Sequence, residues 1–297
     1  MTTGAQTTSD LQSIMTKRRS MTKRLWYQFR RNKLAVLGLG FIVILVLSAI
    51  FAPIISPYPY WKTDLLNTYQ SPSGVHWLGT DADGRDVLTR IIWGLQSACI
   101  VGFGAEVIEL TVGMMLGAIA GYVGGLADNI LMRIVDTVYS FPSFLFSIIL
   151  VVMLGHNLWA ILIAVSATSW VGMARIARSQ VMRVRQGGYV ENARSMGASW
   201  WTIIRRYVLP NSMGPILVAV SFGIPANMMT EAGLSIVGLG IEPPRPDLGQ
   251  MIFTGQDSIF GYPYLLWAPT LLFGIALLSF TFVGDGLREV FDIKSKR

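Results

Sequence analysis

Six apolar runs dominate this chain of 297 residues, and each is long enough to cross a lipid bilayer. They cover residues 34–55, 97–122, 134–154, 158–174, 213–240 and 264–283. A backbone inside lipid must satisfy its own hydrogen bonds, which an open strand cannot do, so we expect every run to be helical. Only 14% of the residues are charged and the mean hydropathy is +0.50, unlike a water-soluble domain. The sequence therefore predicts an all-α integral membrane protein with six transmembrane helices.

The polar segments around these runs define a single membrane domain with short flanks. A cleavable signal peptide does not fit the N-terminal part, because both its basic region and its apolar run are too long. We expect a basic N-terminal arm, a first transmembrane helix, a polar outer loop, a core with five more helices and a short tail. Their predicted bounds are 1–33, 34–55, 56–96, 97–291 and 292–297.

Lys and Arg are distributed unevenly between the two sides of the membrane. If the N-terminus is inside, 20 of the 24 fall in cytoplasmic segments and four fall outside. An excess of basic residues marks the cytoplasmic side, so both termini of this cell-membrane protein are predicted there. The net charge of +7 thus follows a membrane face, where anionic lipid is an expected partner, and nucleic acid is not.

The segment 187–211, GGYVENARSMGASWWTIIRRYVLPN, is polar among apolar neighbours. Its apolar residues recur every three or four positions, which predicts a stripe along a helix that needs a partner. The stripe comprises Val190, Ala193, Gly197, Trp200, Trp201, Ile204 and Val208. We expect two short helices divided at Gly197, with the second capped by Ser199 and limited by Pro210. An ordinary amphipathic surface helix is the alternative.

This segment resembles the EAA loop, E-A-A-x3-G-x9-I-x-L-P, of the membrane subunits of binding-protein-dependent ABC importers. Five of its seven fixed positions match, with Asn192 and Tyr207 as the departures. In that family the loop is a coupling helix that docks into the ATPase subunit. The resemblance implies coupling residues at Glu191, Ala193, Arg194, Gly197, Ala198, Trp200, Leu209 and Pro210.

A second motif, HWLGTDADGRD, lies in the outer loop at 76–86. Its three carboxylates do not have the spacing of an EF-hand, so we expect a loop held by Asp side chains that bond the backbone and Arg85. The motif is similar to the H-W-L-G-T-D-x-x-G-R-D signature of the dipeptide, oligopeptide and nickel branch of these permeases, in its "C"-type subunit. Its predicted key residues are His76, Gly79, Thr80, Asp81, Gly84, Arg85 and Asp86.

Three glutamates interrupt the apolar runs. Carboxylates at membrane depth are costly and usually face a cavity or a partner. Glu231 is therefore a candidate for a translocation path, with structural pairing an equal alternative. For Glu106 and Glu109, which lie three residues apart on one helix face, pairing with a partner subunit is favoured. A proton-coupled secondary transporter that uses these three groups is a rival function.

Motifs of catalysis are absent from the sequence. There is no phosphate-binding G-x-x-x-x-G-K-[ST] loop, and the single cysteine and two histidines offer little for a metal. We expect a non-catalytic permease of the type I ABC importer fold, with no cofactor of its own. The resemblance implies ATP and Mg in one or two partner ATPases, a second homologous permease and an extracytoplasmic binding protein. Di- and oligopeptides are the expected substrates, with nickel or oligosaccharides as alternatives.

Overall fold

The computed structural model describes residues 26–295, so most of the predicted basic arm lies outside the described residues. The secondary structure over this range is helical apart from one isolated bridge between Thr80 and Asp86. The long helices are α2 (Lys33–Ile50), α4 (Val87–Ile108), α5 (Met114–Val123), α6 (Gly125–Tyr139), α7 (Ser143–Leu154), α8 (Leu158–Arg185), α11 (Leu209–Ile236) and α13 (Tyr264–Ser295). The short ones are α3 (Ala52–Ile55), η1 (Leu65–Asn67), α9 (Gly188–Ser195), α10 (Trp200–Ile203) and α12 (Leu248–Gln256).

Five described segments are long and apolar enough to cross a membrane. They are α2, the continuous Val87–Val123 segment, α8, α11 and α13, and a sixth span results if α6 and α7 count as one. The Val87–Val123 span joins α4 to α5 through a π-turn, η2 (Glu109–Gly113). The predicted all-α fold is confirmed, and the six-span count holds when the bent pair is one span.

The third span differs from the single helix predicted for 134–154. It consists of α6 and α7, which meet at an angle of 77°. Pro142 stands just before α7 with an extended ψ of 112°. Proline lacks the amide hydrogen that would continue the helix and disfavours helical backbone in the residue before it. The apolar run is therefore broken at this point.

The second span begins ten residues earlier than predicted, at Val87. Asp86 caps it by accepting a hydrogen bond from the amide of Thr89 at 2.8 Å. Arg90 then lies in its first turns, only 6% exposed, within 3.4 Å of Asp81. In a hydropathy profile, a buried Arg with an acidic partner scores like a residue of a polar loop. The predicted start of the second span was therefore placed too late in the sequence.

A row of glycines joins α5 to α8. Gly113, Gly117 and Gly121 recur every four residues and face backbone carbonyls of α8. A methyl group added at Gly117 would lie 2.1 Å from the carbonyl oxygen of Ala174. Small residues at this spacing let transmembrane helices approach backbone to backbone. The backbones of these two helices are consequently in direct contact.

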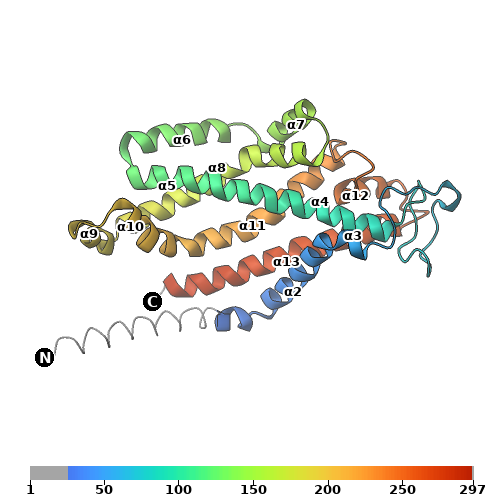
Figure 1. The fold of residues 1–297 in the computed structure, drawn as a ribbon, viewed down its shortest axis with the longest axis horizontal. Coiled ribbons are helices and arrows are strands. Elements are labelled where there is room, and N and C mark those ends of the chain that lie inside the picture. The colour runs from blue at the N-terminus through green and yellow to red at the C-terminus, as the bar shows by residue number, and fades with distance from the viewer. Residues whose placement is uncertain (1–25, 296–297) are drawn as a thin grey trace.

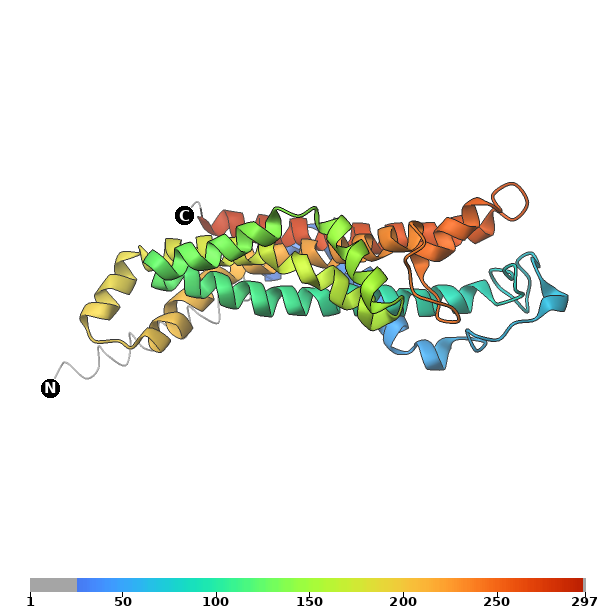
Figure 2. The ribbon, with the colours of Figure 1, turned by 90° about the horizontal axis from the view of Figure 1, so that it is seen from above.

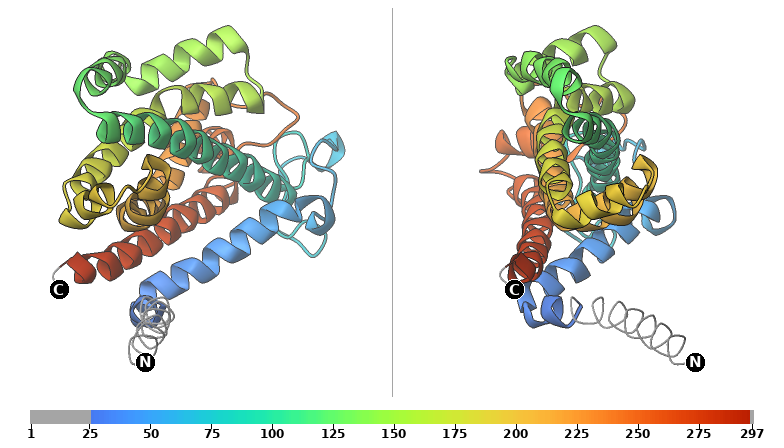
Figure 3. Two further views of the ribbon diagram at one scale, coloured as in Figure 1. Left: turned by 60° about the vertical axis from the view of Figure 1, so that its left-hand side comes forward. Right: turned by 90° about the vertical axis from the view of Figure 1, so that its left-hand side faces the viewer.

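The helices form an elongated bundle with two different ends (Figures 1 and 2). The loop before α4 and the segment after α12 lie at one end, whereas α9 and α10 project from the other. The C-terminal part of α13 points toward the end that carries α9 and α10. Figure 3 shows α2 and α13 side by side along one edge and α6 and α7 along the opposite edge. The two sequence motifs therefore lie at opposite ends of the protein.

Candidate functional site

The segment 187–211 folds as two short helices on either side of Gly197, as predicted. The chain turns there with a φ of +81°, a conformation that glycine adopts without strain. The amide of Ala198 closes the turn by donating to the carbonyl of Ala193 at 3.0 Å. Ser199 caps α10, because its hydroxyl accepts from the amide of Thr202 at 3.3 Å. The predicted division and cap are both confirmed.

The apolar stripe of this segment packs against its own chain, which was not predicted. Val190, Ala193 and Val208 are 1%, 2% and 3% exposed. Val190 and Val208 form a cluster with Val181 and Val184 of α8, partly covered by residues of α5. Ile203, outside the predicted stripe, joins this cluster, while Ile204 is only half-buried. The turn at Gly197 resets the helical phase, so the period of one continuous helix does not carry across it.

The surface left for a partner is therefore the polar face and the turn. Glu191, Gly197, Arg205, Arg206 and Pro210 are exposed. Met196 stands beside Gly197 with 80% of its surface exposed, an apolar side chain at the tip of the protein. Ala198 is half-buried. The side chains of Arg194, Trp200 and Leu209 lie outside the part that the structure describes.

Pro210 does not end the second helix, contrary to the prediction. The chain continues from α10 through a π-turn, η3 (Ile204–Val208), directly into α11, where Pro210 occupies the first turn. Proline is tolerated at that position because its nitrogen needs no hydrogen bond there. The wider π-turn before it shifts the hydrogen-bond register by one residue, which separates the proline ring from the preceding carbonyls.

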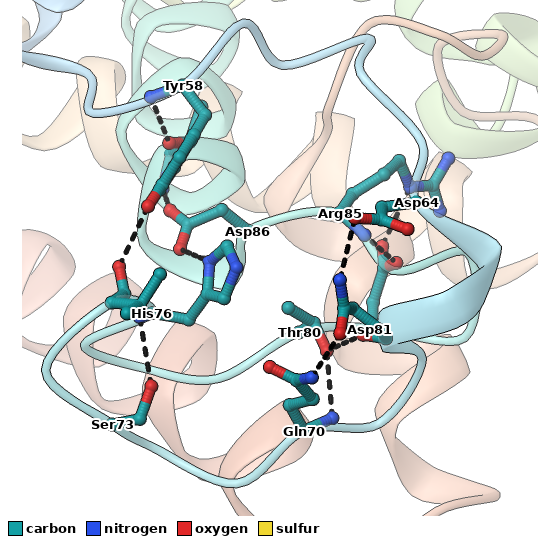
Figure 4. Close-up of polar contacts among 12 residues, drawn as sticks. Tyr58, Asp64, Gln70, Ser73, His76, Thr80, Asp81, Arg85 and Asp86 are labelled. Carbon is teal, nitrogen blue, oxygen red and sulfur yellow. Dashed lines mark hydrogen bonds and ion pairs between the residues drawn. The ribbon is translucent and has the colours of Figure 1, made fainter.

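The outer loop is held by its aspartates, as predicted (Figure 4). Asp81 accepts hydrogen bonds from the amides of Asp83 and Arg85, both at 2.9 Å, and binds the Arg85 guanidinium at 2.8 Å. Arg85 also reaches Asp83 at 2.7 Å. Asp86 caps α4 and lies 2.9 Å from His76 Nδ1. All three carboxylates of the motif thus bind groups of the protein itself, and these contacts are sufficient to explain the conformation of the loop.

The glycines of the motif occur where no side chain would fit. Gly84 has a φ of +69°, and an added methyl group would lie 1.8 Å from the carbonyl oxygen of Asp64. Gly79 has a φ of +76° and packs against Tyr264 of α13. The Tyr264 hydroxyl donates to carbonyls of the loop, 3.0 Å away at Thr80. Thr80 itself is fully buried and donates to Asn67 at 2.6 Å. The motif therefore builds a rigid platform on the bundle.

The three membrane glutamates have different surroundings. Glu231 is fully buried, with its carboxyl group facing that of Asp247. Ser235, one turn along α11, hydrogen-bonds Asp247. Glu106 is 3% exposed and packs against Gly223, where an added methyl group would lie 2.0 Å from its carboxylate. Glu109 is half-buried and lines a cavity. Of the three, Glu109 is the one that faces open space, whereas a path role for Glu231 stays a prediction.

Comparison with known proteins decides the family. The model of the binding-protein-dependent transport system inner membrane component matches residues 113–297, more than half of the chain. The chain belongs to this family. The model of the N-terminal TM domain of oligopeptide transport permease C matches residues 20–72 as well. The predicted membership of the oligopeptide and dipeptide permease branch is thereby confirmed, and the protein is a multi-pass inner-membrane permease.

Relatives of this permease cover nearly its whole length. The oligopeptide transport system permease protein OppC of Bacillus subtilis is 39% identical over 99% of this chain and 96% of its own. The dipeptide transport system permease protein DppC of the same organism is 38% identical over 94% and 87%. A glutathione transport system permease protein, GsiD of Pectobacterium atrosepticum, is 36% identical over 94% and 93%.

Solved structures of other ABC transporters show the same fold. A methionine ABC transporter in an inward-facing conformation matches with a TM-score of 0.57 at 20% identity, covering 68% of this chain and 97% of its own. An amino acid ABC transporter matches with a TM-score of 0.52 at 17% identity, covering 67% and 92%. The fold is that of a type I ABC importer permease.

Proposed function

We propose that this permease is one of the two membrane subunits of an ATP-driven importer of di- and oligopeptides. Its relatives are described as oligopeptide, dipeptide and glutathione permeases, and all three substrates are short peptides. This shared chemistry favours peptides over nickel or oligosaccharides. The chain itself would be non-catalytic and would bind no cofactor.

The importer would be completed by partners at both ends of the bundle. A second homologous permease would form the other half of the pathway, and one or two ATPase subunits would bind ATP and Mg on the cytoplasmic side. An extracytoplasmic binding protein would deliver the peptide to the outer-loop platform. The basic residues predict that both termini and α9 are cytoplasmic, and the elongated bundle agrees, since α9 and the end of α13 point the same way (Figure 1).

The observation that carries the coupling proposal is the exposed turn between α9 and α10. Glu191 on α9 and Met196 beside Gly197 are exposed at the tip of the protein, while Val190 packs α9 against Val181 and Val184 of α8. An exposed turn with charged and apolar side chains can bind a partner while the buried contacts that hold its helix stay intact. Movement of the ATPases would then pass from α9 into α8, which shifts the spans between inward- and outward-facing states.

The test uses the complete importer reconstituted in liposomes, with ATP hydrolysis and peptide uptake measured separately. Glu191→Lys and Gly197→Trp are expected to lower uptake at least tenfold while ATP hydrolysis continues. Ser195→Lys is the matched control, because Ser195 is exposed on the same helix at a position that the motif leaves variable. Normal uptake in both motif variants would refute the coupling role.

The rival function, a proton-coupled transporter, differs from the proposed ATP-driven importer in its energy source. ATP-driven import stops when ATP is depleted and survives an uncoupler, whereas proton-driven import does the reverse. Uptake of a labelled dipeptide into cells under the two treatments decides between them. Competition by unlabelled tripeptide, nickel or oligosaccharide in the same assay tests the substrate class.

A further inference from the structure

A polar cavity opens inside the membrane-spanning part of the bundle. Its volume is about 360 Å³, and η2, α7, α8 and α11 supply its walls. Most of its lining residues are polar, among them Glu109, Ser143, Thr168, Ser169, Asn227 and Thr230. Hydrophobic surroundings make such a lining costly unless it serves a path or a ligand. The size falls within the range of small-molecule sites.

The charge of this cavity has one sign. Glu109 is the ionisable residue among those that line it, and the lining contains neither Lys nor Arg. Asn227, opposite on α11, is 4% exposed, and its side-chain amide lies beside the Glu109 carboxylate. The hydroxyl of Thr230 donates to its own helix at 2.9 Å, so its lone pairs remain to accept. Glu109 and Thr230 can therefore accept from an ammonium group, while the amide nitrogen of Asn227 can donate to a carbonyl oxygen next to it, as in a peptide's N-terminal residue.

The backbone presents Glu109 to the cavity in an unusual way. Glu109 begins the π-turn that joins α4 to α5, and such turns widen a helix by one residue and recur at functional sites. Glu106, one turn earlier, is buried against Gly223. Two glutamates three residues apart are thus separated by their surroundings, one enclosed and one facing the cavity.

The cavity is reachable from the surface of this chain. Ser143 at the start of α7 and Ala226 on α11 both line it and are both exposed. A peptide could therefore enter between α7 and α11, a face that a second permease would turn into a closed pathway.

We propose that this cavity is a binding station on the translocation path, where Glu109 accepts the ammonium group of a peptide's N-terminus. Asn227, beside it, would donate from its side-chain amide to the first carbonyl oxygen of the peptide. This inference rests on the proposed peptide import but concerns a different part of the molecule from the coupling loop. It assigns to Glu109 the contact with substrate, in place of Glu231, which its own chain encloses.

The first test measures the charge preference of the cavity without transport. In the assembled complex, Cys99→Ala removes the single cysteine of this chain, and Thr230→Cys places a thiol on the cavity wall. Labelling rates with a cationic and an anionic methanethiosulfonate of similar size are compared by the mass of this chain. A carboxylate nearby is expected to favour the cationic reagent roughly tenfold, and Glu109→Gln is expected to abolish the preference.

Glu106→Gln is the matched control, because it changes a carboxyl group only three residues away that packs behind Gly223 and does not itself line the cavity. The cationic preference should persist in this variant. A thiol at position 230 that reacts with neither reagent would overturn the proposal, as would an equal loss of preference in both glutamine variants. These outcomes do not depend on ATP or on the coupling loop.

The second test measures maximal uptake of a dipeptide with the binding protein saturated. Glu109→Gln is expected to lower the maximal rate about tenfold, with partial recovery in Glu109→Asp, which keeps the carboxylate. Unchanged maximal uptake in Glu109→Gln would overturn the substrate contact. If the importer shows no ATP-driven uptake at all, the proposed function fails, while the labelling result still judges the cavity.

Discussion

Arg178 on α8 binds both carboxylate oxygens of Asp128 on α6, at 2.5 Å through Nε and 2.6 Å through Nη2. Two-pronged pairs of this kind are stronger than single contacts. Arg175, one turn earlier, contacts Asp136 at 2.8 Å and lies 4.0 Å from the centre of the Tyr139 ring. Two ion pairs thus fasten α6 to α8 along the segment before the 77° bend.

Asp128→Asn is therefore expected to destabilise the protein by about 1 kcal/mol, since the pair is partly exposed. The measurement is thermal unfolding of the purified complex in detergent. Asp136→Asn is the control on the same helix, because Asp136 is 56% exposed and makes a single contact. The loss of stability in Asp136→Asn should be smaller than in Asp128→Asn. Equal losses in the two variants would contradict this ranking of the two ion pairs.

Gly117→Ala should be far more damaging than its chemistry suggests. The added methyl group would meet the carbonyl oxygen of Ala174 at 2.1 Å, and a backbone atom in a helix cannot move aside. Overpacking at such a contact costs about 3 kcal/mol or more. Gly172→Ala on α8 is the control, because nothing lies within 4 Å of the new atom. The yield of folded protein and its unfolding temperature should fall only in the first variant.

Gly84→Ala is expected to open the outer loop. The positive φ and the clash with Asp64 strain the loop by roughly 1–3 kcal/mol. Limited proteolysis of the purified protein should cleave the segment before α4 several times faster than in wild type. Gly74→Ala lies in the same loop with nothing within 4 Å, so its cleavage rate should match wild type. Equal rates for the two variants would show that the strain is absorbed elsewhere.

The stability of the protein should depend on pH through Asp247, which lies in the loop before α12. Burial raises the pKa of this carboxyl group above its ordinary value. The unfolded chain ionises at an ordinary pKa of about 4, while the folded state holds its proton to higher pH. Stability contributed by that proton is therefore complete at low pH and is lost as pH rises through the raised pKa.

Asp247→Asn removes this titration but keeps an oxygen that can accept from the amide of Gly249, now 2.7 Å from Asp247. The unfolding temperature of the variant should fall less than that of wild type as pH is raised above the ordinary carboxyl range of about 4. Asp257→Asn, an exposed change at the other end of α12, should keep the wild-type slope. Identical slopes in wild type and Asp247→Asn would contradict the assignment.

Much of this fold could be predicted from the sequence, because bilayer physics leaves few choices. The apolar runs marked the spans, and Gly197, Ser199 and Asp81 act locally as their side-chain chemistry predicts. These features depend on neighbours within a few residues. They can be predicted without knowledge of the tertiary structure.

Other features depend on tertiary contacts that a pattern does not contain. An amphipathic period shows that a face is buried but not by which molecule, so the stripe around Val190 was assigned to a partner when α8 covers it. Likewise, the spacing of Glu106 and Glu109 indicated one shared face, whereas the π-turn and α11 give them different surroundings. The glycine row at 113, 117 and 121 was missed, although its four-residue spacing in the sequence is a recognisable signal.

The glycine contact between α5 and α8 also sets the mechanical properties of the permease. Because their backbones touch, no deformable layer of side chains separates the two helices. We therefore expect α5 and α8 to tilt together as one rigid unit. α8 has 28 residues, which makes it about 42 Å long. Rotation of a helix of this length by about 10° moves one end about 7 Å relative to the other. A small displacement of α9 would therefore be transmitted along α8 to Thr168 in the cavity wall.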